Sequence, residues 1–150
     1  MNDLVAVRVK GAIPTTSGCA VFLGDEEKSF VIYVDEQVGG AITRILHKRA
    51  YPRPLTHELI QNIFLGFGVS VQRVVINDLQ ESTFYARLIL RQENELGQKL
   101  VELDARPSDS IALALQDQAE ILVAQHVYDA VEDMSWLLEE QDPDEEGEAD

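Results

Sequence analysis

Residues 104–114 read DARPSDSIALA, and this stretch decides how the chain folds. The residues just before it, 101–103, alternate apolar and polar side chains, a pattern that predicts a half-buried strand. After it, apolar residues recur at the spacing of one helical face: Ile111, Ala112, Leu115 and Ala119. Pro107, Ser108 and Asp109 are typical of a helix start. The stretch is therefore a junction at which a strand gives way to a helix.

The junction carries polar side chains that suit a binding or catalytic site. A helix N-terminus presents unpaired N–H groups and partial positive charge, so with Arg106 beside it the junction can hold a phosphate or a carboxylate. Because alternate side chains of a strand share one face, Glu102 and Asp104 point the same way, while Leu103 and Ala105 face the core. In a functional interpretation, acids of the junction bind Mg²⁺ or Mn²⁺ and Arg106 clamps a phosphate.

The same residues also have a purely structural interpretation. Ser108 or Asp109 caps the helix, and Arg106 pairs with a nearby acid. Glu102 then meets water, and a surface ion pair contributes little to stability. Local chemistry alone favours this structural interpretation but leaves the functional one open.

The composition is that of an ordinary globular protein of about one domain. The chain has 150 residues, of which 45% are hydrophobic and 26% are charged. No apolar run approaches the roughly 20 residues that cross a bilayer, and residues 1–3 lack the basic start of a signal peptide. We therefore expect a cytoplasmic protein without a membrane partner. The single Cys19 excludes an intrachain disulfide, and we expect no organic cofactor.

Acidic residues are concentrated at the C-terminal end of the chain. The net charge is −15, but from Pro107 to Asp150 there are 14 Asp and Glu residues and no Lys or Arg. The first 106 residues hold the other 13 acids and all 12 bases, a net charge of −1. An acidic protein repels nucleic acid at long range, so binding a polyanion requires a local basic patch or a metal ion. The acidic run over 141–150 predicts a disordered, solvated tail.

Strand and helix patterns follow one another in clusters. Apolar runs predict strands at 5–9, 20–23, 29–34, 69–77, 83–91, a stretch ending at 104, and 120–124, with a loop at 78–82. Helical periodicity predicts helices at 36–48, from 56 to about 66, from 107 onwards, and at 125–140. Clustered elements indicate an α+β fold: a single domain over residues 1–140, with a mixed, mostly antiparallel sheet packed against about four helices.

A second polar cluster lies at residues 53–58, which read RPLTHE. Proline excludes a helix before this cluster, and Thr56 can cap the helix that follows. That helix is expected to bury one apolar face, formed by Leu59, Ile60, Ile63 and Phe64. A histidine such as His57 can exchange protons near neutral pH, and Arg53 can bind phosphate. The alternative is a helix cap followed by a favourable first-turn acid, Glu58.

The predicted strand at 83–88 has two different faces. One face is expected in the core and carries Phe84, Ala86 and Leu88. The other face carries Thr83, Tyr85 and Arg87. Tyrosine and arginine side chains there suit base stacking and phosphate binding. A protein interface is at least as good an interpretation of this face.

Three segments, at 53–57, 83–86 and 104–114, read RPLTH, TFYA and DARPSDSIALA. In this order and spacing they resemble the bifunctional nuclease domain family, which occurs in bacteria and in plants. The resemblance extends over roughly residues 4–135. It implies an α+β domain that tends to self-associate and acts on RNA and DNA. Its signature positions correspond here to Arg53, His57, Thr83, Asp104, Arg106, Ser108 and Asp109.

Two hypotheses follow from these observations. The first is a nuclease that hydrolyses phosphodiester bonds of RNA or DNA with the help of Mg²⁺ or Mn²⁺. Its catalytic residues would be Asp104, Asp109 and His57, and its metal ligands Asp104, Asp109 and Glu102. Its substrate-binding residues would be Arg53, Arg106, Ser108 and Thr83. The second hypothesis is a non-catalytic homo-oligomeric module that binds an anionic ligand or a protein partner.

Overall fold

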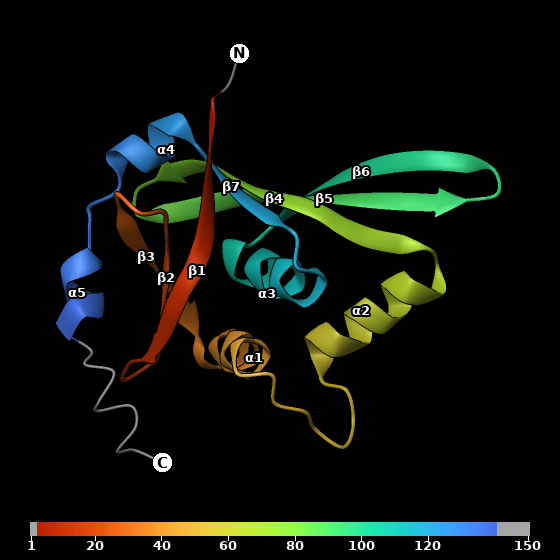
Figure 1. Cartoon of the computed structure of the whole chain (residues 1–150), viewed down its shortest axis with the longest axis horizontal. Coiled ribbons are helices and arrows are strands. Elements are labelled where there is room, and N and C mark those ends of the chain that lie inside the picture. Colours follow the sequence, from red (N-terminus) through yellow and green to blue (C-terminus); the bar gives the residue numbers. More distant parts are fainter. Residues whose placement is uncertain (1–2, 141–150) are drawn as a thin grey trace.

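The computed structural model describes residues 3–140 (Figure 1). Its strands are β1 (Leu4–Pro14), β2 (Gly18–Gly24), β3 (Ser29–Asp35), β4 (Val69–Gln80), β5 (Thr83–Asn94), β6 (Gly97–Ala105) and β7 (Glu120–Ala124). Its helices are α1 (Glu36–Leu46), α2 (Thr56–Gly66), α3 (Pro107–Asp117), α4 (Gln125–Ala130) and α5 (Ser135–Glu140). None of these helices is long and apolar enough to cross a membrane. The predicted α+β fold is confirmed.

The strands form one sheet in the order β3-β2-β1-β7-β4-β5-β6. Two antiparallel units, β1–β3 and β4–β6, meet across β7, which pairs antiparallel with β1 and parallel with β4. Residues 121–124 of β7 are all buried, because this last strand lies in the middle of the sheet. The sheet is therefore mixed and mostly antiparallel, as predicted.

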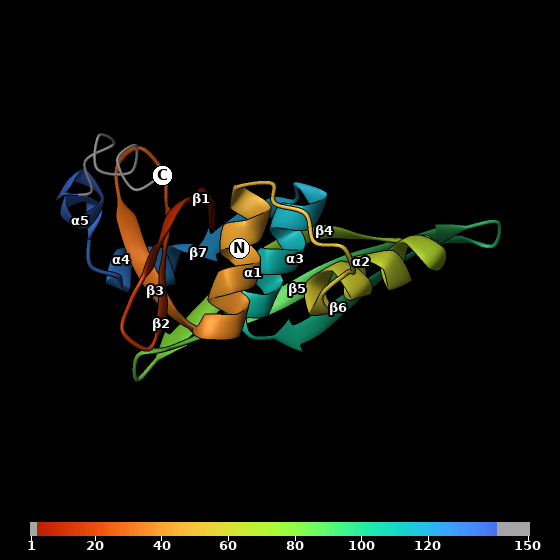
Figure 2. The same ribbon diagram turned by 90° about the horizontal axis from the view of Figure 1, so that it is seen from below.

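Helices α1, α2 and α3 cover the same face of the sheet (Figures 1 and 2). The core lies between these helices and the strands. In α3, residues Ile111 to Ala114 are at most 6% exposed, because their small and branched side chains pack closely against both α1 and the sheet. This helix begins at Pro107, where a missing backbone donor does no harm. Residues 104–114 thus have the predicted strand-to-helix form.

The side chains of β6 alternate across the sheet, but fewer of them are buried than expected. The register pairs Leu88 with Leu103 and Arg87 with Asp104. Leu88 is buried on the helix side, so Leu103 shares that side and Asp104 points away from the helices. The prediction that Leu103 lies in the core is nevertheless wrong, since it is 41% exposed. The reason is that β6 is an edge strand with a neighbour on one side only.

Helix α2 also buries less than its pattern predicts. Ile60 and Phe64 pack against the core as expected. Leu59 and Ile63, predicted on the buried face, are 51% and 48% exposed. Helical periodicity identifies the row of apolar side chains, but α2 packs mainly against α3 and β4. Part of the row therefore stays on the surface.

The loop predicted at 78–82 is shorter than expected. Strands β4 and β5 extend to Gln80 and from Thr83, so only Glu81 and Ser82 connect them. Both residues have positive φ, 50° and 67°, the conformation of a tight two-residue hairpin turn. Neither residue is glycine or asparagine, so the usual sequence signal for such a turn is missing.

The helix predicted at 125–140 is two short helices, α4 and α5. Between them, Asp133 Oδ1 accepts a hydrogen bond from Ser29 N at 3.0 Å. Met134 N donates to Ser29 O at 2.6 Å. These bonds tie the segment to the start of β3 and interrupt the helix. The acidic tail predicted at 141–150 lies outside the described residues, so it stays a prediction.

Gly39 and Gly40, near the start of α1, have different roles. A Cβ atom added to Gly39 would lie 2.5 Å from the Cβ of Cys19, because α1 packs closely on β2 there. A Cβ atom added to Gly40 meets nothing within 4 Å. Close packing therefore requires glycine at position 39 but not at position 40.

Replacing Gly39 with alanine should destabilise the domain by roughly 1–3 kcal/mol, because α1 or Cys19 must move. The matched change Gly40→Ala should stabilise it by up to about 1 kcal/mol, because alanine favours a helix interior. Urea unfolding followed by circular dichroism measures both effects. Equal effects at the two positions would contradict the close approach of α1 to β2.

Candidate active site

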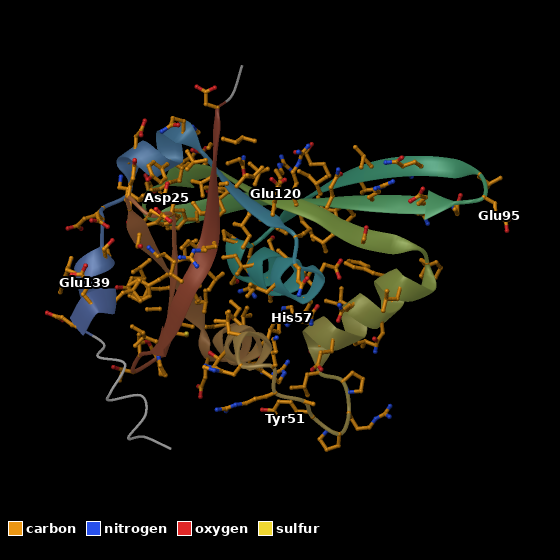
Figure 3. The ribbon with its side chains drawn as sticks, viewed as in Figure 1. Asp25, Tyr51, His57, Glu95, Glu120 and Glu139 are labelled. Atoms are coloured by element: carbon orange, nitrogen blue, oxygen red, sulfur yellow. The ribbon has the colours of Figure 1, made fainter. Side chains whose placement is uncertain are left out.

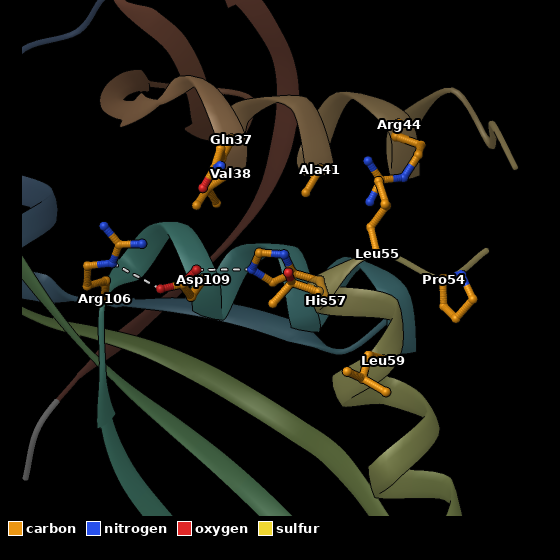
Figure 4. A pocket seen from close by; sticks show the side chains of 11 residues that line it. Gln37, Val38, Ala41, Arg44, Pro54, Leu55, His57, Leu59, Arg106 and Asp109 are labelled. Atoms are coloured by element: carbon orange, nitrogen blue, oxygen red, sulfur yellow. Dashed lines mark hydrogen bonds and ion pairs between the residues drawn. The ribbon is translucent and has the colours of Figure 1, made fainter. Parts of the chain in front are cut away.

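Three helices begin around one cleft of about 620 Å³ (Figure 4). Helix α1 follows Asp35, α2 follows Leu55 and α3 follows Arg106. Side chains from α1 and from the starts of α2 and α3 line the cleft. Asp35 caps α1 by accepting a hydrogen bond from Val38 N at 2.9 Å. The three helix starts bring polar groups from distant parts of the chain into one place.

The centre of this cleft is a row of three polar side chains. His57 Nε2 lies 3.0 Å from Asp109 Oδ1, and Arg106 Nε donates to Asp109 Oδ2 at 3.0 Å (Figure 4). His57 is buried, while the Arg106 side chain is 63% exposed. Asp109 therefore joins a buried imidazole to a guanidinium that faces solvent.

The contact with Asp109 determines the tautomer of His57. An ionised carboxylate only accepts hydrogen bonds, so Nε2 must carry the proton. In neutral His57, Nδ1 is then an acceptor, and the described residues offer it no hydrogen-bond partner. His57 is also one of the residues that line the cleft. A buried imidazole held in this way can take a proton from a reacting group.

Arg106 also links α3 to α1. Its NH1 donates to Asp35 Oδ2 at 3.3 Å, alongside the bond from Nε to Asp109. The hydrogen bond and charge of Asp109, followed by those of Asp35, raise the pKa of Arg106. The Val38 N–H chiefly, and then the charge of Arg106, lower the pKa of Asp35. Both groups therefore stay charged and hold the starts of α1 and α3 together.

Arg44, at the other end of the cleft, was not predicted as a site residue. Its NH2 lies 3.2 Å from Glu58 Oε1, and its guanidinium lies 5.0 Å from the centre of the Tyr51 ring. The same oxygen of Glu58 accepts a hydrogen bond from Leu55 N at 3.2 Å. Arg44 is only 7% exposed. The available signal was the basic run at 44–53, which holds 4 of the 12 Lys and Arg residues and no acid.

The structure divides the predicted site residues into three groups. His57, Asp109 and Arg106 meet in the cleft described above. Thr83 and Ser108 line a neighbouring cleft of about 420 Å³, which also reaches Arg106. The third group lines neither cleft and stays exposed: Arg53, Glu102 and Asp104. Arg106 thus stands between the two clefts.

The predicted metal ligands do not come together. Glu102 and Asp104 lie on the face of β6 that points away from the helices. Asp109 lies on the helix side, where His57 and Arg106 occupy its two oxygens. Within residues 3–140, no group of three or more His, Cys, Asp or Glu side chains is placed to hold a metal ion. A Mg²⁺ site needs convergent oxygen ligands, so these acids do not fit one.

The predicted helix caps are wrong for α2 and α3. Pro107 takes the first position of α3, so Ser108 and Asp109 lie inside its first turn and Arg106 precedes it. Asp109 is therefore free to bind His57 instead of capping the helix. Thr56 likewise lies inside α2, which follows Leu55.

A profile of the bifunctional nuclease domain matches residues 21–134, about three quarters of the chain. The chain belongs to the bifunctional nuclease domain family. Two relatives, uncharacterized proteins from two strains of Mycobacterium tuberculosis, are each 42% identical to it over 95 residues. The match covers 63% of this chain and 51% of each relative, so the chain spans about half the length of these proteins. All residues that line the two clefts lie within the part of the chain that matches the bifunctional nuclease domain.

The ion pair between Arg106 and Asp35 gives a testable pH dependence. In Arg106→Gln, the pKa of Asp35 should rise toward its ordinary value but stay below it, because the Val38 N–H remains. Carbon-13 NMR titration of the aspartate carboxyl groups measures this shift. Asp133, whose pKa is lowered chiefly by Ser135, serves as the internal control and should not move.

The same change should alter stability in a defined pH range. A lowered pKa in the folded state stabilises the fold above the unfolded value of about 3.9, and this contribution disappears as pH falls through the folded value. Part of the difference in unfolding free energy between wild type and Arg106→Gln comes from Asp35. This part should therefore disappear as the pH falls through the folded-state pKa of Asp35. An unchanged titration of Asp35 in the variant would contradict the pairing.

Proposed function

We propose that this domain is a nuclease that hydrolyses phosphodiester bonds of RNA, DNA or both, with His57 as the general base. One observation carries the proposal: His57 Nε2 lies 3.0 Å from Asp109 in the wall of an open cleft. This contact supports the proposal because it leaves Nδ1 able to take a proton. The name of the family points to the same class of reaction.

The reaction needs an activated water and a held phosphate. Nδ1 of His57 takes a proton from water as the water oxygen bonds to phosphorus. The bond from phosphorus to the leaving oxygen breaks, and that oxygen takes a proton from solvent. Arg106 and Arg44, at the two ends of the cleft, balance the charge on the phosphate oxygens. A water nucleophile serves RNA and DNA alike, because it needs no 2′-hydroxyl group.

Three of the other predicted residues, Thr83, Ser108 and Arg53, have supporting roles in this proposal. Thr83 and Ser108 share the neighbouring cleft with Arg106, which suits contact with an adjacent part of the substrate. Arg53 lies outside both clefts, so only a substrate that extends beyond them can contact it. Assistance by Mg²⁺ or Mn²⁺ stays a prediction, and so does the cytoplasmic location.

Cleavage of labelled single-stranded RNA and DNA tests the proposal, with Mg²⁺, Mn²⁺ or EDTA in parallel reactions. Asp109→Asn should lower the rate roughly 100- to 10,000-fold, because an amide no longer determines the tautomer of His57. His57→Gln should lower it by a similar factor, because the base is lost.

A second histidine–aspartate pair supplies the matched control. His126 Nε2 lies 3.4 Å from Asp78 Oδ1, and the His126 side chain is 66% exposed and outside the cleft. His126→Gln should therefore leave the rate unchanged. Full activity in both His57→Gln and Asp109→Asn would show that the cleft is not the active site.

A non-catalytic homo-oligomeric module is the second candidate function. An apolar row on α2, formed by Leu55, Leu59 and Ile63, is 42%, 51% and 48% exposed. Leu55 and Leu59 also line the cleft, so a second copy packed on this row would narrow the entrance. Arg106 would then bind an anionic ligand rather than a substrate.

Light scattering across micromolar concentrations tests this self-association. Ile63→Glu should shift the protein toward smaller species, because burying a charge in an apolar contact is costly. Leu96→Glu is the matched control, since Leu96 is 97% exposed in the β5–β6 turn. A wild-type protein that stays monomeric at every concentration would contradict this second candidate.

A further inference from the structure

We infer that residues 44–53 form a binding arm for single-stranded nucleic acid that continues the cleft. The segment reads RILHKRAYPR and holds 4 of the 12 Lys and Arg residues, 1 of the 4 Tyr residues and no Asp or Glu. In a chain of net charge −15, this is the local basic patch that binding a polyanion requires. The inference rests on the proposed function, because it names the part of the substrate site that lies beyond the catalytic centre.

Three of the four basic side chains of this arm, those of Lys48, Arg49 and Arg53, face solvent. Every residue from 47 to 56 is exposed. In the part of the chain that the structure describes, Lys48, Arg49 and Arg53 form no ion pair. The dipole of α1 does not explain these cations, because Arg44 already occupies its last turn and the other three follow the helix. Their charge is therefore available to a ligand.

The arm joins the catalytic cleft through Arg44. This residue lines the main cleft and also a third cleft of about 350 Å³, whose walls include Arg49 and Tyr51. Figure 3 shows Tyr51 and His57 on the same side of the sheet. A strand with one phosphate at His57 can therefore continue along Arg44 to Tyr51 and Arg49.

Tyr51 is positioned to stack on a nucleobase. The guanidinium of Arg44 lies 5.0 Å from the centre of its ring, and Glu58 holds Arg44 with a contact of 3.2 Å. Tyr51 is 52% exposed, so much of its ring is open to solvent. Pro52 and Pro54 restrict the backbone after it, which lowers the entropy lost on binding. Stacking on Tyr51 requires an unstacked base, which favours a single strand over a duplex.

Fluorescence anisotropy with labelled single-stranded oligothymidine tests the arm in the full chain. Binding is measured in EDTA at several salt concentrations, for wild type and for Asp109→Asn, so that cleavage does not interfere. The triple variant Lys48→Ala/Arg49→Ala/Arg53→Ala should bind roughly tenfold or more weakly at low salt. Its slope of log affinity against log salt should shrink by roughly 2, about 0.7 for each lost phosphate contact. Tyr51→Ala should weaken binding roughly 5- to 100-fold.

Control variants remove the same number of positive charges, or one aromatic ring, from other surfaces of the protein. The control triple is Arg8→Ala/Arg91→Ala/Lys99→Ala, which removes one Lys and two Arg side chains from strands outside the clefts and changes the net charge by the same amount. The control for Tyr51 is Trp136→Ala, because Trp136 is 51% exposed on α5 and lines none of the clefts of the site. Both controls should bind like wild type, and melting curves should show that every variant folds. Equal losses in the two triples, or unchanged binding in the arm triple, would overturn the inference.

The results separate this inference from the proposed nuclease activity. Binding that depends on the arm, without cleavage by any form of the protein, would support the arm and overturn the nuclease. Cleavage by the protein, combined with binding that the arm variants do not weaken, would support the nuclease and overturn the arm. Binding to vesicles of phosphatidylglycerol but not to the oligonucleotide would also overturn the inference.

Discussion

The carboxylate of Asp109 is the group on which the arrangement of the site depends. One oxygen holds His57 at the start of α2, and the other accepts a hydrogen bond from Arg106, the residue that precedes α3. Arg106 then reaches Asp35 in front of α1. Because the pKa of Arg106 is raised and that of Asp35 is lowered, these ions stay paired near neutral pH. Helix α2 relies on this link most, since His57 is its one buried residue.

Much of the fold could be predicted because its signals are local. Proline followed by alanine and leucine after an alternating strand is enough to place the junction at 104–114. The failures depend on distant contacts or on unusual residues. The predicted helix at 125–140 breaks because Asp133 bonds Ser29, 104 residues earlier. The turn at Glu81 and Ser82 adopts positive φ without the glycine that signals it.

The site was harder to predict because it joins segments far apart in the sequence. His57 and Asp109 are 52 residues apart, and only the family resemblance placed them in one set. Alternation correctly put Glu102 and Asp104 on one face of a strand, but it cannot show that the helices cover the other face. Arg44 was missed because periodicity alone does not mark a charged side chain as buried.

The central claim is that Asp109 holds His57 Nε2 and so presents Nδ1 to the cleft as a proton acceptor. Nitrogen-15 NMR of the histidine rings at about pH 8, where histidine is ordinarily neutral, tests it most directly. His126, with 66% of its side chain exposed, gives the reference spectrum of a loosely held ring. We predict that His57 is almost entirely the tautomer with its proton on Nε2. A proton on Nδ1, or a tautomer mixture like that of His126, would contradict it.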